Sequence, residues 1–393
     1  MNILVANAGS TSFKYRLFSA QNSAGLRAVA VGRITNIGYD RSEYTFEHGG
    51  RKGRETLGRI SYEDVVDLVM DGLAKDGLGR VDAVGFKTVH AGRFRGAEVL
   101  TRDVLKAMEE HLTVAPAHNR HYIDVIALFM DKYPGLPLVG LFEPHFHDSL
   151  PAEARVYGVP YEWYEKHGVE KYGFHGASHH FVRDRMRELA PRAGRVISCH
   201  LGGSSSLCAI RDGKSIDTSF GLSLQSGILH SNRCGDIDVF MLPYLREKLG
   251  ISYEELFREL ASNAGLKGIS GMEGDLKEIE KEAEKGNPRA ELAVKKFVYD
   301  VLRYIGGYVV ALGGLDALVF TGGIGENSVR VRRDVCRRLA FLGLVLDEET
   351  NAEAKGETRV TEDSSKVAAW VIPANEELVV AREVEKVLRT YRR

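Results

Sequence analysis

The amino-acid sequence predicts an α/β protein built from two related domains. The chain has 393 residues, more than a single hydrophobic core ordinarily organises. Along its length, apolar runs typical of strands alternate with segments of helical periodicity, which favours layers of helices on sheets. A pattern of strand, small-residue turn and strand near the start also recurs about half a chain later, which indicates a duplicated domain.

The predicted elements follow from the spacing of apolar residues. Apolar, β-prone runs predict strands at 3–6, 81–90, 136–142, 195–200 and 316–320. Helical periodicity predicts helices at 62–75, 123–132, 290–312 and 376–391. No low-complexity linker separates these segments, so we expect the domains to pack closely. We place the first domain at 1–147 with a returning C-terminal helix at 378–393, and the second domain at 148–377.

Composition narrows the class of protein. The chain has 53 Lys plus Arg and 54 Asp plus Glu, a net charge of −1, which argues against a nucleic-acid or membrane-surface partner. No apolar run reaches membrane-spanning length, and residues 1–20 lack the core of a signal peptide. The cysteines form no CxxC pair, so neither a zinc site nor a disulfide framework is indicated. We expect a cytoplasmic protein with reduced thiols.

The first predicted strand runs into a turn of small residues, NAGSTS, followed by a second strand that carries Lys14. A plain β-hairpin is the common meaning of such a pattern. The alternative is a phosphate cradle, since small residues leave backbone N–H groups uncovered, hydroxyls add donors and a lysine adds charge. The turn alone leaves both interpretations open.

The recurring pattern and a third glycine-rich turn bear on this question. ILVANAGSTSFKYRLF recurs in outline as VISCHLGGSSSLCAI, which suggests two related domains, with two coincidental hairpins as the alternative. After the strand at 316–320, the sequence TGGIGENS predicts a turn formed by Gly322, Gly323 and Gly325, with Asn327 or Ser328 capping the next helix. Such a junction suits nucleotide contact, but it matches neither a Walker A motif nor a clean GxGxxG.

Seven ordered motifs carry a specific resemblance. They span residues 7 to 381 and read NAGSTSFKY, APAHN, YGFHGASHH, DTSFG, NRCGDID, FTGGIGENS and IPANEELVVA. The sequence resembles the acetate kinase family of the actin-like, sugar-kinase-like superfamily. The resemblance implies two duplicated actin-like (ribonuclease H-like) domains with an ATP cleft between them, in a homodimer. It also implies Mg²⁺ and ATP, and reversible phosphoryl transfer to a small carboxylate, giving an acyl phosphate and ADP.

The resemblance further implies roles for the residues within these motifs and beside them. The implied catalytic residues are His175, Arg233, Lys87, His118 and Glu143. The implied nucleotide-binding residues are Asn7, Ser10, Ser12, Lys14, His200, Gly202, Gly203, Ser204, Asp217, Gly322, Gly323, Ile324 and Asn327. The implied magnesium site contains Asn7 and Glu376. The implied substrate pocket contains Val89, Ala117, Phe174 and Leu224.

These residue types suit phosphoryl transfer, in which a protein mainly positions the reactants and stabilises charge on the phosphoryl oxygens. A cationic Arg233 and a hydrogen-bonding His175 fit that task. A carboxylate acceptor is already nucleophilic, so no general base is needed. Each residue also has a structural alternative: a hydrogen-bonding histidine, an ion pair of Arg233 with Asp236 or Asp238, and a helix-start acid for Glu376. We interpret His145, His147, His179 and His180 as structural.

The sequence departs from the family pattern mainly around the acceptor. Lys87 stands where the family has an arginine, and lysine is a point charge without the planar fork. Glu143 stands where an aspartate is usual, Gly203 replaces an asparagine, and 224–233 reads LQSGILHSNR in place of a sequence close to PLEGLMMGTR. Ala117 stands where a larger leucine is usual, so we expect room for another carbon or two. These changes suggest an altered acceptor pocket.

Three functions therefore remain in view. The first is an ATP-dependent kinase of acetate or propionate. The second is the same chemistry on a larger or substituted carboxylate. The third is a non-metabolic actin-like protein that binds ATP and acts by domain closure. Acyl hydroxamate formation from acid, ATP and hydroxylamine distinguishes the first two from the third.

Overall fold

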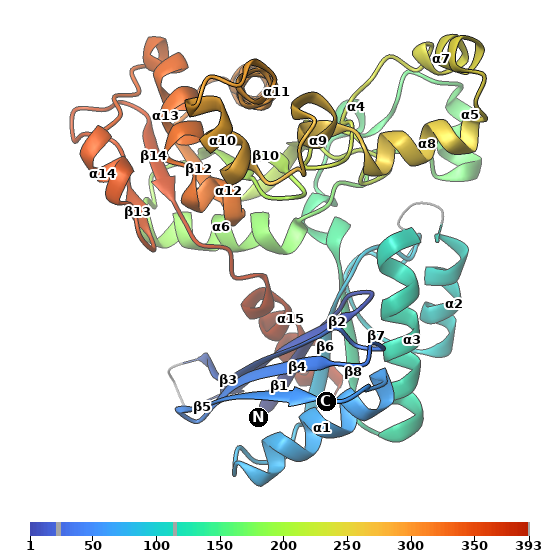
Figure 1. Ribbon diagram of the computed structural model, residues 1–393. Coiled ribbons are helices and arrows are strands. Elements are labelled where there is room, and N and C mark those ends of the chain that lie inside the picture. The colour runs from blue at the N-terminus through green and yellow to red at the C-terminus, as the bar shows by residue number, and fades with distance from the viewer. Residues whose placement is uncertain (21–24, 113–115, 392–393) are drawn as a thin grey trace. The chain divides into compact units, whose positions relative to one another are not determined.

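A computed structural model gives the fold and describes the chain except for residues 21–24, 113–115 and 392–393 (Figure 1). The chain forms two compact units. Unit 1 consists of Met1–His145 and Asn375–Arg393, and unit 2 of Phe146–Ala374. Every strand and helix that the sequence predicts is present. Most ends agree within three residues, but the helix predicted at 123–132 begins at Pro116. No helix in the described residues is long and apolar enough to span a bilayer.

Unit 1 contains an eight-stranded sheet in the order β5-β4-β3-β2-β1-β6-β8-β7. The strands β1 to β5 form an antiparallel meander, while β6 is parallel to both β1 and β8. The central strand β1 is almost wholly buried, as its run of apolar residues requires. The strands are β1 (Asn2–Ala8), β2 (Ser12–Ala20), β3 (Leu26–Thr35), β4 (Ser42–His48), β5 (Arg51–Leu57), β6 (Ala83–Thr88), β7 (Ala97–Val99) and β8 (Leu138–Phe142).

Helices cover both faces of this sheet. The helices α1 (Tyr62–Lys75), α2 (Arg102–Glu110) and α3 (Pro116–Lys132) share one apolar core with the sheet. The C-terminal helix α15 (Glu376–Tyr391) packs against β1, β6 and β8. Gly85 permits this close packing, because a Cβ atom there would lie 2.8 Å from a methyl group of Val384. This packing brings the start of α15 to the edge of the sheet where β6 and β8 end.

Unit 2 contains a six-stranded sheet in the order β11-β10-β9-β12-β14-β13. The strands β9 to β11 form an antiparallel meander, and β12 is parallel to both β9 and β14. The same arrangement occurs in unit 1, where β1 to β3 form the meander and β6 and β8 follow in parallel. The repeat predicted from the sequence is thus present in the topology. The strands are β9 (Arg195–His200), β10 (Ser206–Arg211), β11 (Lys214–Thr218), β12 (Ala317–Thr321), β13 (Thr358–Arg359) and β14 (Ala368–Val371).

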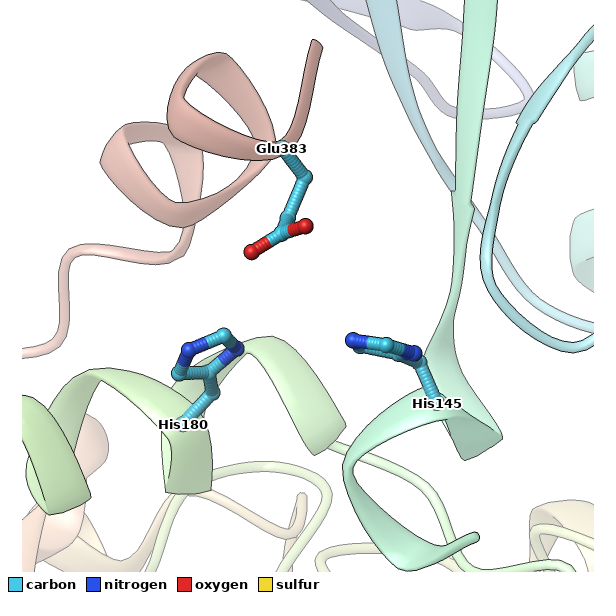
Figure 2. A group of neighbouring side chains, drawn as sticks. All are labelled: His145, His180 and Glu383. Atoms are coloured by element: carbon cyan, nitrogen blue, oxygen red, sulfur yellow. The ribbon is translucent and has the colours of Figure 1, made fainter. Parts of the chain in front are cut away.

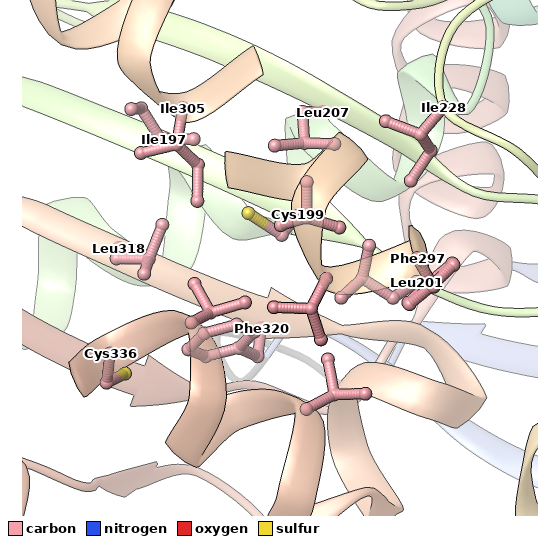
Figure 3. Close-up of a cluster of buried hydrophobic side chains, with 14 of the residues drawn as sticks. Ile197, Cys199, Leu201, Leu207, Ile228, Phe297, Ile305, Leu318, Phe320 and Cys336 are labelled. Atoms are coloured by element: carbon pink, nitrogen blue, oxygen red, sulfur yellow. The ribbon is translucent and has the colours of Figure 1, made fainter. Parts of the chain in front are cut away.

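A long helix, α11 (Pro288–Leu312), lies over the core of unit 2. It begins at an Asn287 cap with proline in its first turn and ends at Gly313 in the left-handed conformation. Figure 3 shows the core that α11 shares with β9, β10 and β12, including Ile197, Phe297 and Phe320. The other helical segments of the described residues are η2 (Glu143–His147), which spans the junction of the units, α4 (Ala152–Arg155), α5 (Tyr161–His167), α6 (Gly176–Leu189), α7 (Met241–Leu249), α8 (Tyr253–Ser262), α9 (Gly265–Ser270), α10 (Leu276–Glu284), α12 (Gly322–Asn327), α13 (Val329–Arg338), η3 (Ala340–Leu342) and α14 (Glu348–Glu353).

One local prediction is wrong. The run of glycines after β12 forms a short helix, α12, instead of a turn. Gly322 starts it with φ of 76°, and the carbonyl of Leu201 accepts hydrogen bonds from the N–H groups of Ile324 and Gly325. Ser328 then caps α13, as one of the two predicted caps.

Candidate active site

The first glycine–serine turn joins β1 to β2 as a tight hairpin. The N–H of Gly9 donates to the carbonyl of Ser12 at 2.8 Å. Tyr62 on α1 donates its hydroxyl hydrogen to the carbonyls of Gly9 and Ser12, which holds the turn from behind. A Cβ atom at Gly9 would lie 2.9 Å from the Ser12 hydroxyl. Ser10 is exposed and Ser12 half-buried, so the turn presents hydroxyls on a fixed backbone.

Two other predicted residues lie beside this turn. Asn7 and Lys14 are directly opposite each other on β1 and β2, so their side chains share one face of the sheet. The Asn7 amide oxygen accepts a hydrogen bond from the hydroxyl of Tyr122 on α3 at 2.8 Å. The Lys14 side chain is exposed.

An ionic cluster lies where β6 and β8 end in unit 1. Lys87 on β6 places Nζ 2.9 Å from Oε2 of Glu376, the first residue of α15. The same Nζ lies 3.2 Å from Oε1 of Glu143, which follows β8 directly. Glu143 is buried and Glu376 is largely so. The parallel pairing of β6 with β8 explains the cluster, because carboxyl ends of parallel strands meet at one edge of a sheet.

The two glutamates keep Lys87 in its ammonium form. Burial alone disfavours the ammonium form of Lys87, but Glu376 and Glu143 outweigh it, so the pKa of Lys87 is raised well above its usual value. Burial likewise raises the pKa of Tyr122, which remains a neutral donor. With one ammonium and two carboxylates, the cluster carries a net charge of −1 when both acids are ionised. The charge of Lys87 is therefore already compensated inside unit 1.

The remaining predicted residues of unit 1 are less informative. Val89 is buried just beyond β6. Ala117 and His118 fall in the first turn of α3, and their side chains lie outside the described part of the structure. His145 at the end of unit 1 has a ring nitrogen within 4.8 Å of a carboxylate oxygen of Glu383 on α15 (Figure 2).

In unit 2, the second glycine–serine turn lies against α12. The N–H of Gly202 donates to the Ser205 hydroxyl at 3.0 Å, which tightens the turn between β9 and β10. A Cβ atom at Gly202 would lie 3.8 Å from the backbone nitrogen of Gly323 on α12. The Ser204 hydroxyl is buried and has no hydrogen-bond partner within the described residues. An unpartnered buried donor beside two glycine-rich segments fits a phosphate ligand.

The structure brings most of the other predicted nucleotide residues to this place. Gly203 and Gly323 are exposed, Ile324 is half-buried, and the side chain of Asn327 donates to the carbonyl of Gly323 at 2.8 Å. Asp217 differs, because it lies on the edge strand β11 and accepts from Lys171 at 2.7 Å and from the N–H of Thr218.

His175 occupies an unusual backbone position directly before α6. Its φ of 57° and ψ of 27° are left-handed, which is unfavourable for a residue with a side chain. Its Nδ1 lies 2.9 Å from the hydroxyl of Ser206 on β10. Its ring centroid lies 4.1 Å from that of His200 and 5.2 Å from that of Phe220. The ring is thus held on two sides.

Arg233 is a half-buried cation without an acidic partner. Its guanidinium donates to the carbonyl of Leu224 at 2.5 Å, and no carboxylate of the described residues lies within ion-pair distance. The ion pair with Asp236 or Asp238 that the sequence left open is not formed. Asp236 accepts from the N–H of Gly227 and the hydroxyl of Tyr304, and Asp238 accepts from the N–H of Phe240. Burial lowers the pKa of Arg233 to about 10, so it stays charged at neutral pH.

Aromatic rings lie between His175 and Arg233. Phe220 lies edge-on to the predicted pocket residue Phe174 at 5.6 Å and stacks on His230 at 5.3 Å. His230 accepts from the N–H of Ser205 through Nδ1, and burial, then the neighbouring Arg233, lowers its pKa to about 3. The predicted pocket residue Leu224 contributes the carbonyl that Arg233 binds. Sequence reasoning missed Tyr122, Ser206 and His230, since their roles depend on contacts between elements.

Among the histidines interpreted as structural, His179 and His147 are buried and bonded to serine hydroxyls of the sheet. His180 stacks on Phe146 at 5.7 Å within unit 2.

Two units of one strand topology, each with a glycine- and serine-rich hairpin turn, place the chain in the actin-like, sugar-kinase-like class of folds. The family model described as "Acetokinase family" matches residues 2–382, and the chain belongs to that family.

Curated relatives and solved structures agree with this assignment. The chain is 38% identical over 403 residues to an acetate kinase of Halothermothrix orenii, covering 99% of this chain and 100% of the relative. It is 40% identical over 401 residues to an acetate kinase of Dictyoglomus thermophilum, covering 99% of each. A propionate kinase structure from Francisella tularensis has a TM-score of 0.89 at 34% identity, covering 97% of this chain and 98% of the other. The acetate kinase structure of Porphyromonas gingivalis has a TM-score of 0.88 at 33% identity, covering 98% and 99%.

These findings confirm the predicted family, fold class and enzyme class. The chain is an ATP-dependent phosphotransferase with a carboxyl group as acceptor. Membership of this family of enzymes does not support the third function, a non-metabolic actin-like protein.

Proposed function

We propose that this enzyme transfers the γ-phosphoryl group of Mg·ATP reversibly to acetate or propionate, giving the acyl phosphate and ADP. Arg233 carries the proposal, because its half-buried guanidinium pairs with no carboxylate in the part of the chain that the structure describes, which suits an anionic ligand. The names of the relatives, acetate kinases and a propionate kinase, support this choice of acids.

The reaction requires phosphoryl transfer to the acid, stabilisation of charge during transfer, and binding of the nucleotide. A carboxylate oxygen of the acid bonds to the γ-phosphorus as the bond to the bridging oxygen of ADP breaks, so no proton needs to be removed. Arg233 and His175 stabilise charge on the oxygens in flight. The backbone and hydroxyls at Ser10, Ser12 and Gly202–Ser204 bind phosphates, while His200, Asp217 and α12 with Asn327 position the nucleotide.

The ionic cluster of unit 1 fits a magnesium ion. Glu376, Glu143 and Asn7 offer carboxylate and amide oxygens, the ligands that Mg²⁺ prefers, and the two carboxyl groups share the single ammonium group of Lys87. Asn7 and Glu376 would hold the ion, and Lys87 would bridge the two carboxylates and offset their repulsion. Bound Mg²⁺ neutralises phosphate charge, which favours transfer.

The acceptor end favours a second candidate, an acid somewhat larger than acetate. We assign Lys87, His118 and Glu143 to this end, with an apolar pocket of Val89, Ala117, Phe174 and Leu224. Lys87 is a weak clamp for the substrate carboxylate, because two glutamates already compensate its charge. Alanine at 117, where a larger leucine is usual in the family, would leave space for extra carbon, and each buried CH₂ contributes about 0.8 kcal/mol.

The test is hydroxamate formation from ATP, hydroxylamine and a panel of acetate, propionate, butyrate and isobutyrate. We expect acyl hydroxamate with acetate and propionate, and the highest kcat/KM for propionate or a slightly larger acid. ATP binding without acyl phosphate from any acid would refute the proposal. The highest kcat/KM for acetate would refute only the enlarged pocket.

We further propose a cytoplasmic homodimer. The four cysteines are free thiols, which supports a reducing compartment. In unit 2, Val239, Phe240, Tyr244 and Phe257 expose more than half of their surface near α7 and α8, which supports a second copy as partner. Light scattering should give a dimer for the parent and a monomer for Phe240→Glu. A monomeric parent would refute the dimer, and a dimeric Phe240→Glu would refute this surface.

A further inference from the structure

A chain of hydrogen bonds inside unit 2 ends on His175. The Ser206 hydroxyl lies 2.9 Å from Nδ1 of His175 and 2.9 Å from Nε2 of His179. Nδ1 of His179 lies 2.9 Å from the hydroxyl of Ser198 on β9. Ser198, Ser206 and His179 are completely buried. These hydrogen bonds therefore connect the sheet, through His179 on α6, to His175, the residue that we assign to the phosphoryl group.

Helix geometry places the two imidazoles together. His175 is the left-handed residue before α6 and His179 lies in the first turn of that helix, and both rings reach the hydroxyl of Ser206. The N–H of His179 also donates to the carbonyl of His175 at 3.0 Å. Ser206 reaches both rings because it opens β10, opposite His200 in the strand pair.

The protonation state of His179 limits which atoms can donate in the hydrogen bonds between His179, Ser206 and His175. Burial, with His147 and His200 nearby, holds the pKa of His179 well below its usual value, so it is neutral. A neutral imidazole has one donor and one acceptor nitrogen, and a hydroxyl has a single hydrogen to give. Two patterns satisfy these contacts: His179 donates from Nε2 to Ser206 and Ser206 donates to Nδ1 of His175, or Ser206 donates to Nε2 of His179 and accepts from Nδ1 of His175. The first pattern leaves the proton of a neutral His175 on Nε2.

We propose that Ser206 and His179 are positioning residues, which hold His175 in the tautomer with its proton on Nε2. A neutral ring in this tautomer donates to a phosphoryl oxygen without first taking up a proton. The left-handed backbone of His175 and its contact with His200, whose Nδ1 is 2.8 Å from the Ser178 hydroxyl, fix the same ring. The inference rests on the proposed function, in which His175 contacts the phosphoryl group.

The experiment compares Ser206→Ala with a matched control, Ser215→Ala. Ser215 is also completely buried in unit 2, and its hydroxyl lies 2.9 Å from Nδ1 of His147. Both variants lose the same kind of hydrogen bond, so a general loss of stability affects both. We expect kcat to fall about 10–100-fold in Ser206→Ala with KM for ATP within about threefold. In Ser215→Ala we expect kcat within about twofold of the parent.

Two readouts report the tautomer directly. In nitrogen-15 NMR of histidine-labelled enzyme, His175 should report a proton on Nε2 in the parent and in Ser215→Ala, and mixed tautomers in Ser206→Ala. The kcat of Ser206→Ala should rise from pH 8 to pH 6, because an imidazolium carries protons on both nitrogens. That of Ser215→Ala should keep the parent's profile. Ser206→Cys keeps the size with a weaker donor and provides the same test if Ser206→Ala does not fold.

His175→Ala separates the two ways of failing. If kcat falls in His175→Ala while Ser206→Ala matches Ser215→Ala in kcat, tautomer and pH profile, the positioning inference is wrong and the role of His175 stands. If kcat is unchanged in His175→Ala, the proposed function of His175 itself is wrong. Adding Ser206→Ala to His175→Ala should cost no further activity, since Ser206 acts through that ring.

Discussion

Replacing Lys87 by methionine tests whether this residue is an internal counter-ion. Its Nζ lies 2.9 Å from Glu376 and 3.2 Å from Glu143, and about 23% of its side chain is exposed. At an effective dielectric constant of about 20, each of these contacts attracts by about 5–6 kcal/mol before desolvation is counted. Removal of one partner from a buried ion pair typically costs about 3–5 kcal/mol, because a charge is left uncompensated. In Lys87→Met, two carboxylates would remain.

We therefore expect Lys87→Met to lower the stability of unit 1 by about 3–5 kcal/mol, or roughly 6–20 °C in the Tm of that unit. Lys87→Met with Glu143→Gln should recover part of the loss, since only one carboxylate has then lost Lys87 as a counter-ion. Differential scanning calorimetry measures both. The control is Lys132→Met, because Lys132 also contacts two carboxylates in unit 1, but Glu63 and Asp67 are exposed. Its Tm shift should be far smaller.

The response to pH gives an independent check. Without Lys87, repulsion between Glu143 and Glu376 should raise the pKa of one of them above its unfolded value. The folded state then binds an extra proton, so the deficit of Lys87→Met should shrink as pH falls from 8 to 5. Equal Tm shifts in Lys87→Met and Lys132→Met, or a deficit independent of pH, would refute the compensated-charge interpretation.

Four further predictions concern Arg233, Ser12, His230 and the acceptor pocket. Arg233→Ala should lower kcat by about 10²–10³ with KM for ATP little changed, and unchanged turnover in a folded variant would exclude it from the mechanism. Ser12→Val should reduce turnover while the free energy of unfolding stays within about 1–2 kcal/mol, and full activity would favour the plain hairpin. His230 has a folded pKa of about 3, so stability should fall as pH drops below the unfolded value of about 6.5; in urea titrations from pH 7.5 to 5.5, His230→Gln should lose less than the parent. Lys87→Arg with Ala117→Leu should shift kcat/KM toward acetate in the acid panel, and an unchanged preference would contradict the pocket argument.

The sequence predicted what depends on local pattern. The apolar run of β1 and the periodicity of α11 determine their elements, although α11 begins at Pro288 after an Asn287 cap, two residues before the predicted start. The glycine run after β12 was misread because three glycines in six residues oppose helix formation. The structure overrides this propensity, since the carbonyl of Leu201 accepts two N–H groups of α12 from a neighbouring strand end.

The partners of site residues were beyond sequence reasoning for a physical reason. Lys87 and Glu376 are 289 positions apart, and only the packing of α15 on the sheet brings them together. The pair His175 and His179 has a helical spacing that is readable from the sequence. Their shared contact with Ser206 depends on the pairing of β9 with β10, which no spacing along the chain encodes.

The duplicated topology has produced two different chemistries at equivalent positions. In unit 1 the carboxyl ends of β6 and β8 carry Lys87 and lead into Glu143, beside Glu376, and these two carboxyl groups suit a cation. In unit 2 the equivalent strand β12 leads directly into Gly322, where the backbone of α12 lies against the second glycine–serine turn. The charge there comes from Arg233, while burial lowers the pKa of His230 beside it and that of His179 behind His175, so both of these rings are neutral. Under the proposed function, one strand topology used twice would bind ions of opposite charge, with carboxylates at the strand ends of unit 1 for magnesium and backbone N–H groups and Arg233 in unit 2 for phosphate.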